Sequence, residues 1–127
     1  MNLIAIVVVA LLNIALGMVW YSNTVFGKVW LKLTGKKKME GTGQSYALGA
    51  LSSLMTSFAL AVFIVYMNAN NIAAGAFAGF LAWAGFVATV TLGSVIWEGR
   101  PAQLWLLNNA YNLLSYIVMG AILAVWA

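Results

Sequence analysis

Apolar residues along this chain are grouped into four long runs, which are separated by short polar segments. As an α-helix the first run, Leu3–Trp20, extends for roughly 27 Å, close to the thickness of the hydrocarbon core of a bilayer. It is followed by Tyr21, and aromatic side chains gather at membrane–water interfaces. The pattern predicts transmembrane helices at residues 3–21, 45–67, 72–97 and 102–126. Because their turns are short, we expect one all-α bundle, residues 1–127, in which sequential helices are antiparallel neighbours.

The segment between the first two runs has a different pattern. Within residues 24–35, the apolar positions share one helical face, and Lys28 and Lys32 lie on another. The apolar positions are Val25, Phe26, Val29, Trp30 and Leu33. This pattern is typical of an amphipathic helix that lies in the headgroup region of a membrane. Gly35 suits the end of this interfacial helix, because glycine readily adopts the left-handed conformation that closes many helices.

Composition agrees with a membrane protein and excludes several kinds of chemistry. Hydrophobic residues make up 65% of the chain and charged residues 6%, whereas soluble domains carry about 25% charged residues. The lack of Cys and His excludes disulfides, Cys- or His-based zinc sites and His-ligated haem, so we expect no metal and no cofactor. No pair of acidic residues lies in a membrane segment, so the usual groups for acid–base catalysis are missing. We therefore expect that the protein is not an enzyme.

The basic residues predict how the chain is oriented. Five of the six lie in the first loop region, and the sixth, Arg100, lies in the third loop. The five are Lys28, Lys32, Lys36, Lys37 and Lys38. Because cytoplasmic loops are enriched in Lys and Arg, we expect both of these loops inside and both termini outside, in a bacterial inner membrane. No basic residue precedes the first run, which favours a retained helix over a cleaved signal peptide.

The lysine cluster has two interpretations. The simpler one, which we favour, is that it only sets the topology of the chain. The other is that these lysines also bind the headgroups of anionic lipids. In either case the expected partner is the bilayer, and we expect no nucleic acid.

Uncharged polar residues are confined to the predicted cytoplasmic half of every helix. Asn13, Asn108, Asn109 and Asn112 lie in that half, whereas segments 3–12, 58–65, 72–87 and 117–127 contain no Ser, Thr, Asn, Gln or charge. Amides are costly in hydrocarbon unless they are hydrogen-bonded, so we expect Asn13, Asn108 and Asn112 to point inward near Ser53, Thr56 or Ser94, with Asn109 facing about the same way as Asn112. This polar layer is either a pocket open to the cytoplasm or a set of helix–helix hydrogen bonds.

The other half is expected to be closed and closely packed. We expect four aromatic residues to fill it and to leave no continuous pore: Phe63, Phe77, Phe80 and Trp83. Gly75 and Gly79 form a small-xxx-small pair, a pattern that lets two helices approach closely, and on this basis we predict a homo-oligomer. Glu98 and Arg100 flank the third turn, and we interpret them as an interfacial ion pair in preference to a proton or cation site.

Several short motifs resemble those of a known family. The motifs are Trp20-Tyr21-Ser22, Phe26-Gly27-Lys28 with Trp30, Gly79-Phe80-Leu81-Ala82-Trp83, Glu98-Gly99-Arg100 and Met119-Gly120-Ala121-Ile122-Leu123. Together they resemble the bacterial membrane family catalogued as domain of unknown function 1761, over nearly the whole chain. The chain departs from the family at Asn23, where Pro is expected. The resemblance implies a four-helix membrane protein and no assigned activity.

Two functions are compatible with these features. One is the binding or transport of a small neutral or amphipathic solute by an oligomer, through Asn13, Asn108, Asn109 and Asn112. The alternative is a non-catalytic accessory subunit of a larger membrane complex.

The predicted orientation is testable by cysteine accessibility in intact cells. A Cys at position 70, in the uncharged second loop, should react with a membrane-impermeant thiol reagent added outside. A Cys at position 37 should react only after the cells are permeabilised. The reverse pattern would show that the charged loops lie outside.

Overall fold

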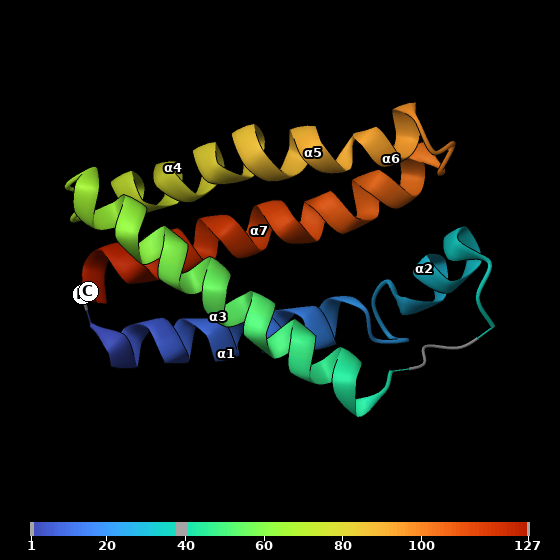
Figure 1. Ribbon diagram of the computed structural model, residues 1–127, viewed down its shortest axis with the longest axis horizontal. Coiled ribbons are helices and arrows are strands. Elements are labelled where there is room, and N and C mark those ends of the chain that lie inside the picture. Colours follow the sequence, from blue (N-terminus) through green and yellow to red (C-terminus); the bar gives the residue numbers. More distant parts are fainter. Residues whose placement is uncertain (1, 38–40, 127) are drawn as a thin grey trace.

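The computed structural model describes residues 2–37 and 41–126, and in these ranges every regular element is helical. Four antiparallel rods run along the molecule (Figure 1). They are α1 (Leu3–Trp20), α3 (Gly43–Tyr66), a rod of four segments that begins with α4 (Ile72–Ala82), and α7 (Ala102–Trp126). All four are long and apolar enough to cross a membrane. The predicted fold class, an all-α bundle of four transmembrane helices, is therefore confirmed.

The pattern of apolar residues predicted that the interfacial helix begins at Thr24. In the structure this short helix, α2 (Gly27–Thr34), begins at Gly27. The preceding residues form a tight corner, in which the Phe26 amide donates to the Trp20 carbonyl at 3.0 Å and the Gly27 amide to the Ser22 carbonyl at 2.8 Å. A Cβ at Gly27 would overlap the backbone of Tyr21 and Ser22. The corner thus requires glycine at position 27. The helix ends at Gly35 with φ of 77°, the left-handed conformation predicted for it.

The third rod is not one regular α-helix. After α4 come a π-helix, η1 (Trp83–Ala88), and two short pieces, α5 (Thr89–Thr91) and α6 (Gly93–Ile96). Two hydroxyls bond back to the helix here: Thr89 donates to the Gly85 carbonyl and Thr91 to the Val87 carbonyl, each at 2.7 Å. Such back-bonding competes with the regular ladder and bends helices. Single-turn π segments are frequent at functional sites.

The end of the bundle that holds both termini (Figure 1) is closed by a close contact between glycines of α4 and α7. Gly75 and Gly79 of α4 lie directly on the α7 backbone, at Gly120 and Tyr116, so that a Cβ at either glycine would overlap it. The glycine pair is therefore used within the chain, and it is not a surface for contact between subunits. Around it, Val9, Leu60, Met119 and Leu123 are fully buried.

Three of the four aromatic residues expected to plug this half do not do so, whereas Trp83 is partly buried and its indole nitrogen donates to Asn109. Phe63, Phe77 and Phe80 are 40%, 56% and 39% exposed, and so they lie on the outer surface of the bundle. Their rings are too large for helices that approach as closely as α4 and α7 do. Close backbone contact closes this end, and the aromatic side chains face outward.

The opposite end, which holds α2 and the turn at residues 97–101, is open; we call it the charged-loop end (Figure 1). Residues 43–52 of α3 are all exposed, because α3 leads away from α7 towards this end. Buried residues of α3 begin only at Ser53. The first and third loops lie at the same end, as four antiparallel helices require. Which side of the membrane this end faces remains a prediction.

The glycine contact gives a direct test of the packing. Gly79→Ala should destabilise the bundle by about 1–3 kcal/mol, because the methyl group forces α4 away from α7. Gly49→Ala is the matched control, since a Cβ there has nothing within 4 Å. It should be neutral or slightly stabilising, because alanine favours helix over glycine. Unfolding in mixed micelles with SDS, followed by circular dichroism, measures both. Equal stability of the two variants would contradict the contact.

Candidate functional site

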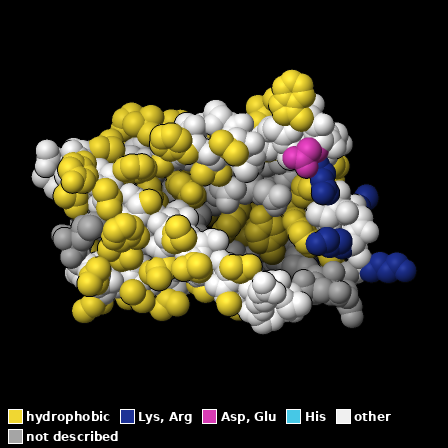
Figure 2. All heavy atoms as spheres, viewed as in Figure 1, with side chains coloured by type: hydrophobic (Ala, Val, Ile, Leu, Met, Phe, Trp, Pro, Cys, Tyr) yellow, Lys and Arg dark blue, Asp and Glu magenta, His cyan; other side chains and the backbone are white. Residues whose placement is uncertain are grey.

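Two adjoining cavities occupy the charged-loop end. The larger, of about 780 Å³, lies between α2, the α5–α6 segment and α7. The smaller, of about 450 Å³, lies between α1, α3 and α7. Both volumes are in the range of ligand-binding pockets. Three residues line both cavities: Tyr21, Tyr111 and Asn112. Figure 2 shows the charged side chains gathered at this end and the surface hollowed beside them.

Asn13 is the centre of a buried hydrogen-bond network that joins three helices. Its side-chain nitrogen donates to Ser53 at 2.9 Å, and the Ser53 hydroxyl donates to the Ala10 carbonyl at 2.8 Å. Its side-chain oxygen accepts from the Tyr111 hydroxyl at 2.9 Å and from the Ser115 hydroxyl. Asn13 points inward beside Ser53, as predicted. Because both ends of this amide have partners, its main role is to hold α1, α3 and α7 together.

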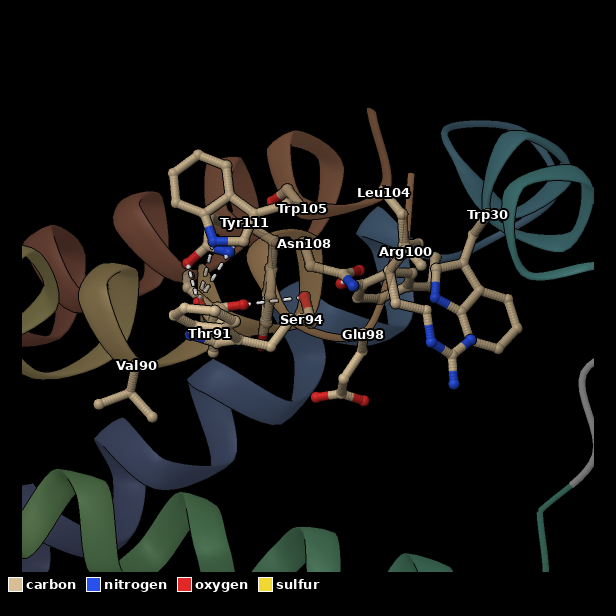
Figure 3. A pocket seen from close by; sticks show the side chains of 15 residues that line it. Trp30, Val90, Thr91, Ser94, Glu98, Arg100, Leu104, Trp105, Asn108 and Tyr111 are labelled. Atoms are coloured by element: carbon tan, nitrogen blue, oxygen red, sulfur yellow. Dashed lines mark hydrogen bonds between the residues drawn. The ribbon is translucent and has the colours of Figure 1, made fainter. Parts of the chain in front are cut away.

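Asn109 has the same kind of role on the other side of α7. It is 3% exposed, and its oxygen accepts from the Trp83 indole nitrogen at 3.1 Å. Its nitrogen donates to the Thr91 hydroxyl at 3.2 Å and to the Trp105 carbonyl at 3.0 Å. Trp105 also donates from its indole to Thr91, and this cluster forms one wall of the larger cavity (Figure 3). Asn109 therefore holds α7 against the irregular third rod.

Asn108 contacts the start of the first loop. Its side-chain oxygen accepts from the Tyr21 hydroxyl at 2.6 Å. Burial, and to a smaller extent the neighbouring Tyr111, raise the pKa of Tyr21 to about 12. Tyr21 therefore keeps its proton at physiological pH and acts as a donor. The rings of Tyr111 and Trp30 lie edge-on to the Tyr21 ring, at centroid distances of 5.6 Å and 6.2 Å.

Asn112 differs from the other three asparagines. It is partly buried and lines both cavities. Within the described part of the chain, no hydrogen bond engages its side-chain amide. The predicted polar layer thus consists of two internally bonded asparagines, one asparagine bonded through its oxygen to Tyr21, and one asparagine whose amide faces the junction of the two cavities.

Comparison with protein families assigns the chain. A family described as protein of unknown function (DUF1761) matches residues 4–124. The chain belongs to this family. The resemblance seen in the sequence motifs is therefore confirmed. No curated protein and no solved structure matches the chain.

The motifs that carry the DUF1761 resemblance lie at structurally demanding places. Trp20 and Phe26 pack together with ring centroids 4.6 Å apart and hold the corner before α2. Tyr21 enters the site, Gly79 forms the close contact with α7, and Trp83 is bonded to Asn109. Asn23, where the resemblance led us to expect Pro, is exposed at the corner.

The charged residues at the mouth of the larger cavity do not form the predicted ion pair. Glu98 and Arg100 both line this cavity, but their side chains point in different directions in Figure 3, and no salt bridge joins these two described residues. The turn is instead closed by its backbone: Gly99 has φ of 70°, and the Arg100 amide donates to the Ser94 carbonyl at 3.0 Å.

The lysine cluster is exposed where the structure describes it. Lys28, Lys32, Lys36 and Lys37 lie on the surface, and Lys38 falls outside the described residues. The Lys36 ammonium lies 5.4 Å from the centroid of the Trp30 ring, a cation–π contact. Within the described ranges, no cluster of His, Cys, Asp or Glu suits a metal ion.

Several site residues were not predicted from the sequence. Tyr21 was interpreted only as an interfacial aromatic residue, and Tyr111, Thr91 and Trp105 were not singled out as site residues. Tyr111 is four residues before Ser115 and both bond Asn13, so helical spacing was a usable signal. Of the predicted neighbours, Thr56 lines the smaller cavity and Ser94 the larger one.

The Asn13 network is testable by a double-mutant cycle. Asn13→Ala should cost about 1–3 kcal/mol of stability, because it leaves the buried Ser115 hydroxyl without its acceptor. Adding Ser115→Ala to Asn13→Ala should then cost little more, since the pair acts as one unit. Asn23→Ala, at an exposed position, is the control and should be neutral. Strictly additive losses would mean that the two side chains do not interact.

Proposed function

We propose that this membrane protein is a non-catalytic binding protein for a small neutral or amphipathic solute, which enters the two cavities at the charged-loop end. The observation that carries the proposal is the Asn112 amide at their junction, which has no hydrogen-bond partner within the described part of the chain. An amide in a membrane segment needs a partner, and a ligand or water supplies one. Asn112 is thus the residue most suited to recognise a polar group.

The walls of the cavities suit such a solute. Tyr21, Tyr111 and Trp30 supply aromatic surface, and the side-chain nitrogen of Asn108 has no hydrogen-bond partner among the described residues, while its oxygen accepts from Tyr21. Binding pockets typically combine aromatic surface with a few such polar groups. The two charged residues of the larger cavity, Glu98 and Arg100, are on the turn at its mouth. Because these charged residues are at the mouth, the interior suits a neutral solute, which needs no charged partner there.

The closed half of the bundle limits how a solute could cross the membrane through this protein. The contact of Gly75 and Gly79 with α7 leaves no room for a solute between these helices. Transport would need α4 and α7 to separate, or a route formed between subunits. Binding from the charged-loop end needs neither. If this end faces the cytoplasm, as the lysines predict, the solute is bound from that side.

The accessory-subunit hypothesis is the second candidate, and one observation favours it. Residues 43–52 of α3 are all exposed, although they include the polar residues Gln44, Ser45 and Ser52. Another membrane subunit, or a second copy of this chain, would cover such a surface. Copurification from native membranes distinguishes the candidates: a different protein at fixed stoichiometry supports the accessory role.

The binding proposal predicts that one asparagine controls retention of the solute. Wild-type protein purified in mild detergent from native membranes should carry a small molecule, which mass spectrometry of an organic extract detects. Asn112→Leu should lower its amount by about tenfold, the effect of losing about 1.4 kcal/mol. Asn70→Leu, at the exposed turn of the closed end, is the matched control and should leave it unchanged. Equal retention in all three proteins would overturn the proposal.

A further inference from the structure

A third cavity lies deeper in the bundle and is mainly apolar. It has a volume of about 340 Å³ and lies between α3, η1 and α7. Its apolar walls are formed by Met55, Ala59, Leu60, Phe63, Ala82, Phe86 and Val87. The two remaining lining residues, Thr56 and Tyr116, carry hydroxyls. Such a space suits a hydrocarbon group better than a polar one.

The three cavities follow one another along the bundle. Thr56 and Tyr116 line both the smaller polar cavity and the apolar cavity. In the same way, Tyr21, Tyr111 and Asn112 line both polar cavities. The series therefore begins at the charged loops, passes the free amide of Asn112, and ends in an apolar branch beside the π-helix.

The apolar branch also opens to the side of the bundle. Met55, Phe63 and Phe86 are 63%, 40% and 67% exposed, so the lining residues reach the surface that lipid covers. The ring centroids of Phe63 and Phe86 lie 6.5 Å apart, within the range of an aromatic contact, so these two side chains form the outer edge of the cavity between α3 and η1. A hydrocarbon chain would enter from the membrane by displacing these exposed side chains.

We propose that the solute is a neutral single-chain amphiphile from the leaflet on the charged-loop side. Its polar end bonds Asn112, and its hydrocarbon chain extends past Thr56 and Tyr116 into the apolar branch. This inference rests on the proposed binding function and specifies its ligand class. A neutral polar end follows from the smaller polar cavity, whose lining contains no charged residue. An ionised group there would be left without a counter-ion. A single chain follows from the single apolar branch of the series.

The probe is a long-chain monoacylglycerol that carries a photoreactive diazirine at the end of its chain, added to the protein in nanodiscs. Saturable labelling is expected on peptides from residues 55–63 of α3 and 82–88 of the third rod. Ala59→Trp fills the apolar branch and should lower this labelling by about tenfold. Ala47→Trp is the matched control on the same helix, because residue 47 lines none of the three cavities and is exposed. It should label like the wild type.

A short-chain monoacylglycerol separates this inference from the proposed function. It should bind wild type and Ala59→Trp equally, because its polar end needs only the Asn112 region. If Ala59→Trp labels like the wild type with the long-chain probe, chain recognition is wrong, although solute binding stands. If neither probe binds the wild type saturably, the amphiphile assignment fails, and the retention assay with Asn112→Leu decides separately whether solute binding stands. Stronger labelling by an equivalent fatty acid or two-chain phospholipid would overturn the neutral single-chain assignment. If Ala59→Trp does not fold, Val87→Trp blocks the branch from its other wall.

Discussion

The contact between the backbones of α4 and α7 is the constraint on which the rest of the architecture depends. Gly75, Gly79 and Gly120 let the two helices touch without intervening side chains. In a bilayer no hydrophobic force drives helices together, so their association depends on close van der Waals packing of this kind. Towards the charged-loop end the same pair of rods is separated by larger groups, Trp83, Asn109 and Trp105. A bundle that is tight at one end and held apart at the other is open in the shape of a wedge.

The asparagines show how one residue type has different roles within this wedge. An amide without a hydrogen bond in hydrocarbon costs free energy, so each asparagine is expected to have a hydrogen-bond partner. Asn13 and Asn109 find theirs inside the protein and thereby fix α7 against α1, α3 and the π-helical rod. Asn112 finds none within the described residues, and it lies where both cavities meet. This difference between neighbouring amides separates packing from recognition.

The sequence predicted the elements better than their contacts. Hydrophobic run length located the four spans, and Gly35 located the end of α2. The confinement of polar residues to one half also predicted which half would carry hydrogen bonds. These are local properties, which depend on composition and on helix geometry.

Contacts between helices were harder to predict, because they depend on which faces meet. Asn108 and Asn109 are adjacent, but one residue of an α-helix turns the side chain by about 100°, so they reach Tyr21 and Thr91 on different sides of α7. The aromatic plug failed for a related reason: the glycines of α4 face α7, and Phe77 and Phe80 on the same helix face outward. Glu98 and Arg100 were expected to pair because they are close in sequence. In the structure the left-handed Gly99 lies between them, and no salt bridge joins these two described residues.

The corner between α1 and α2 connects the surface charge to the interior. Gly27 permits a turn so tight that the rings of Trp20 and Phe26 pack together at a tilt, and this places Tyr21 on Asn108 and beside Trp30. Trp30 in turn lines the larger cavity and contacts Lys36. The position of α2 is therefore coupled, through the phenol of Tyr21, to Asn108 of α7. Residues that resemble an interfacial anchor when taken singly thus form one wall of the site. This accounts for the aromatic residues Trp20, Tyr21 and Phe26 and for Gly27 in a segment where a simple loop would suffice to connect two helices.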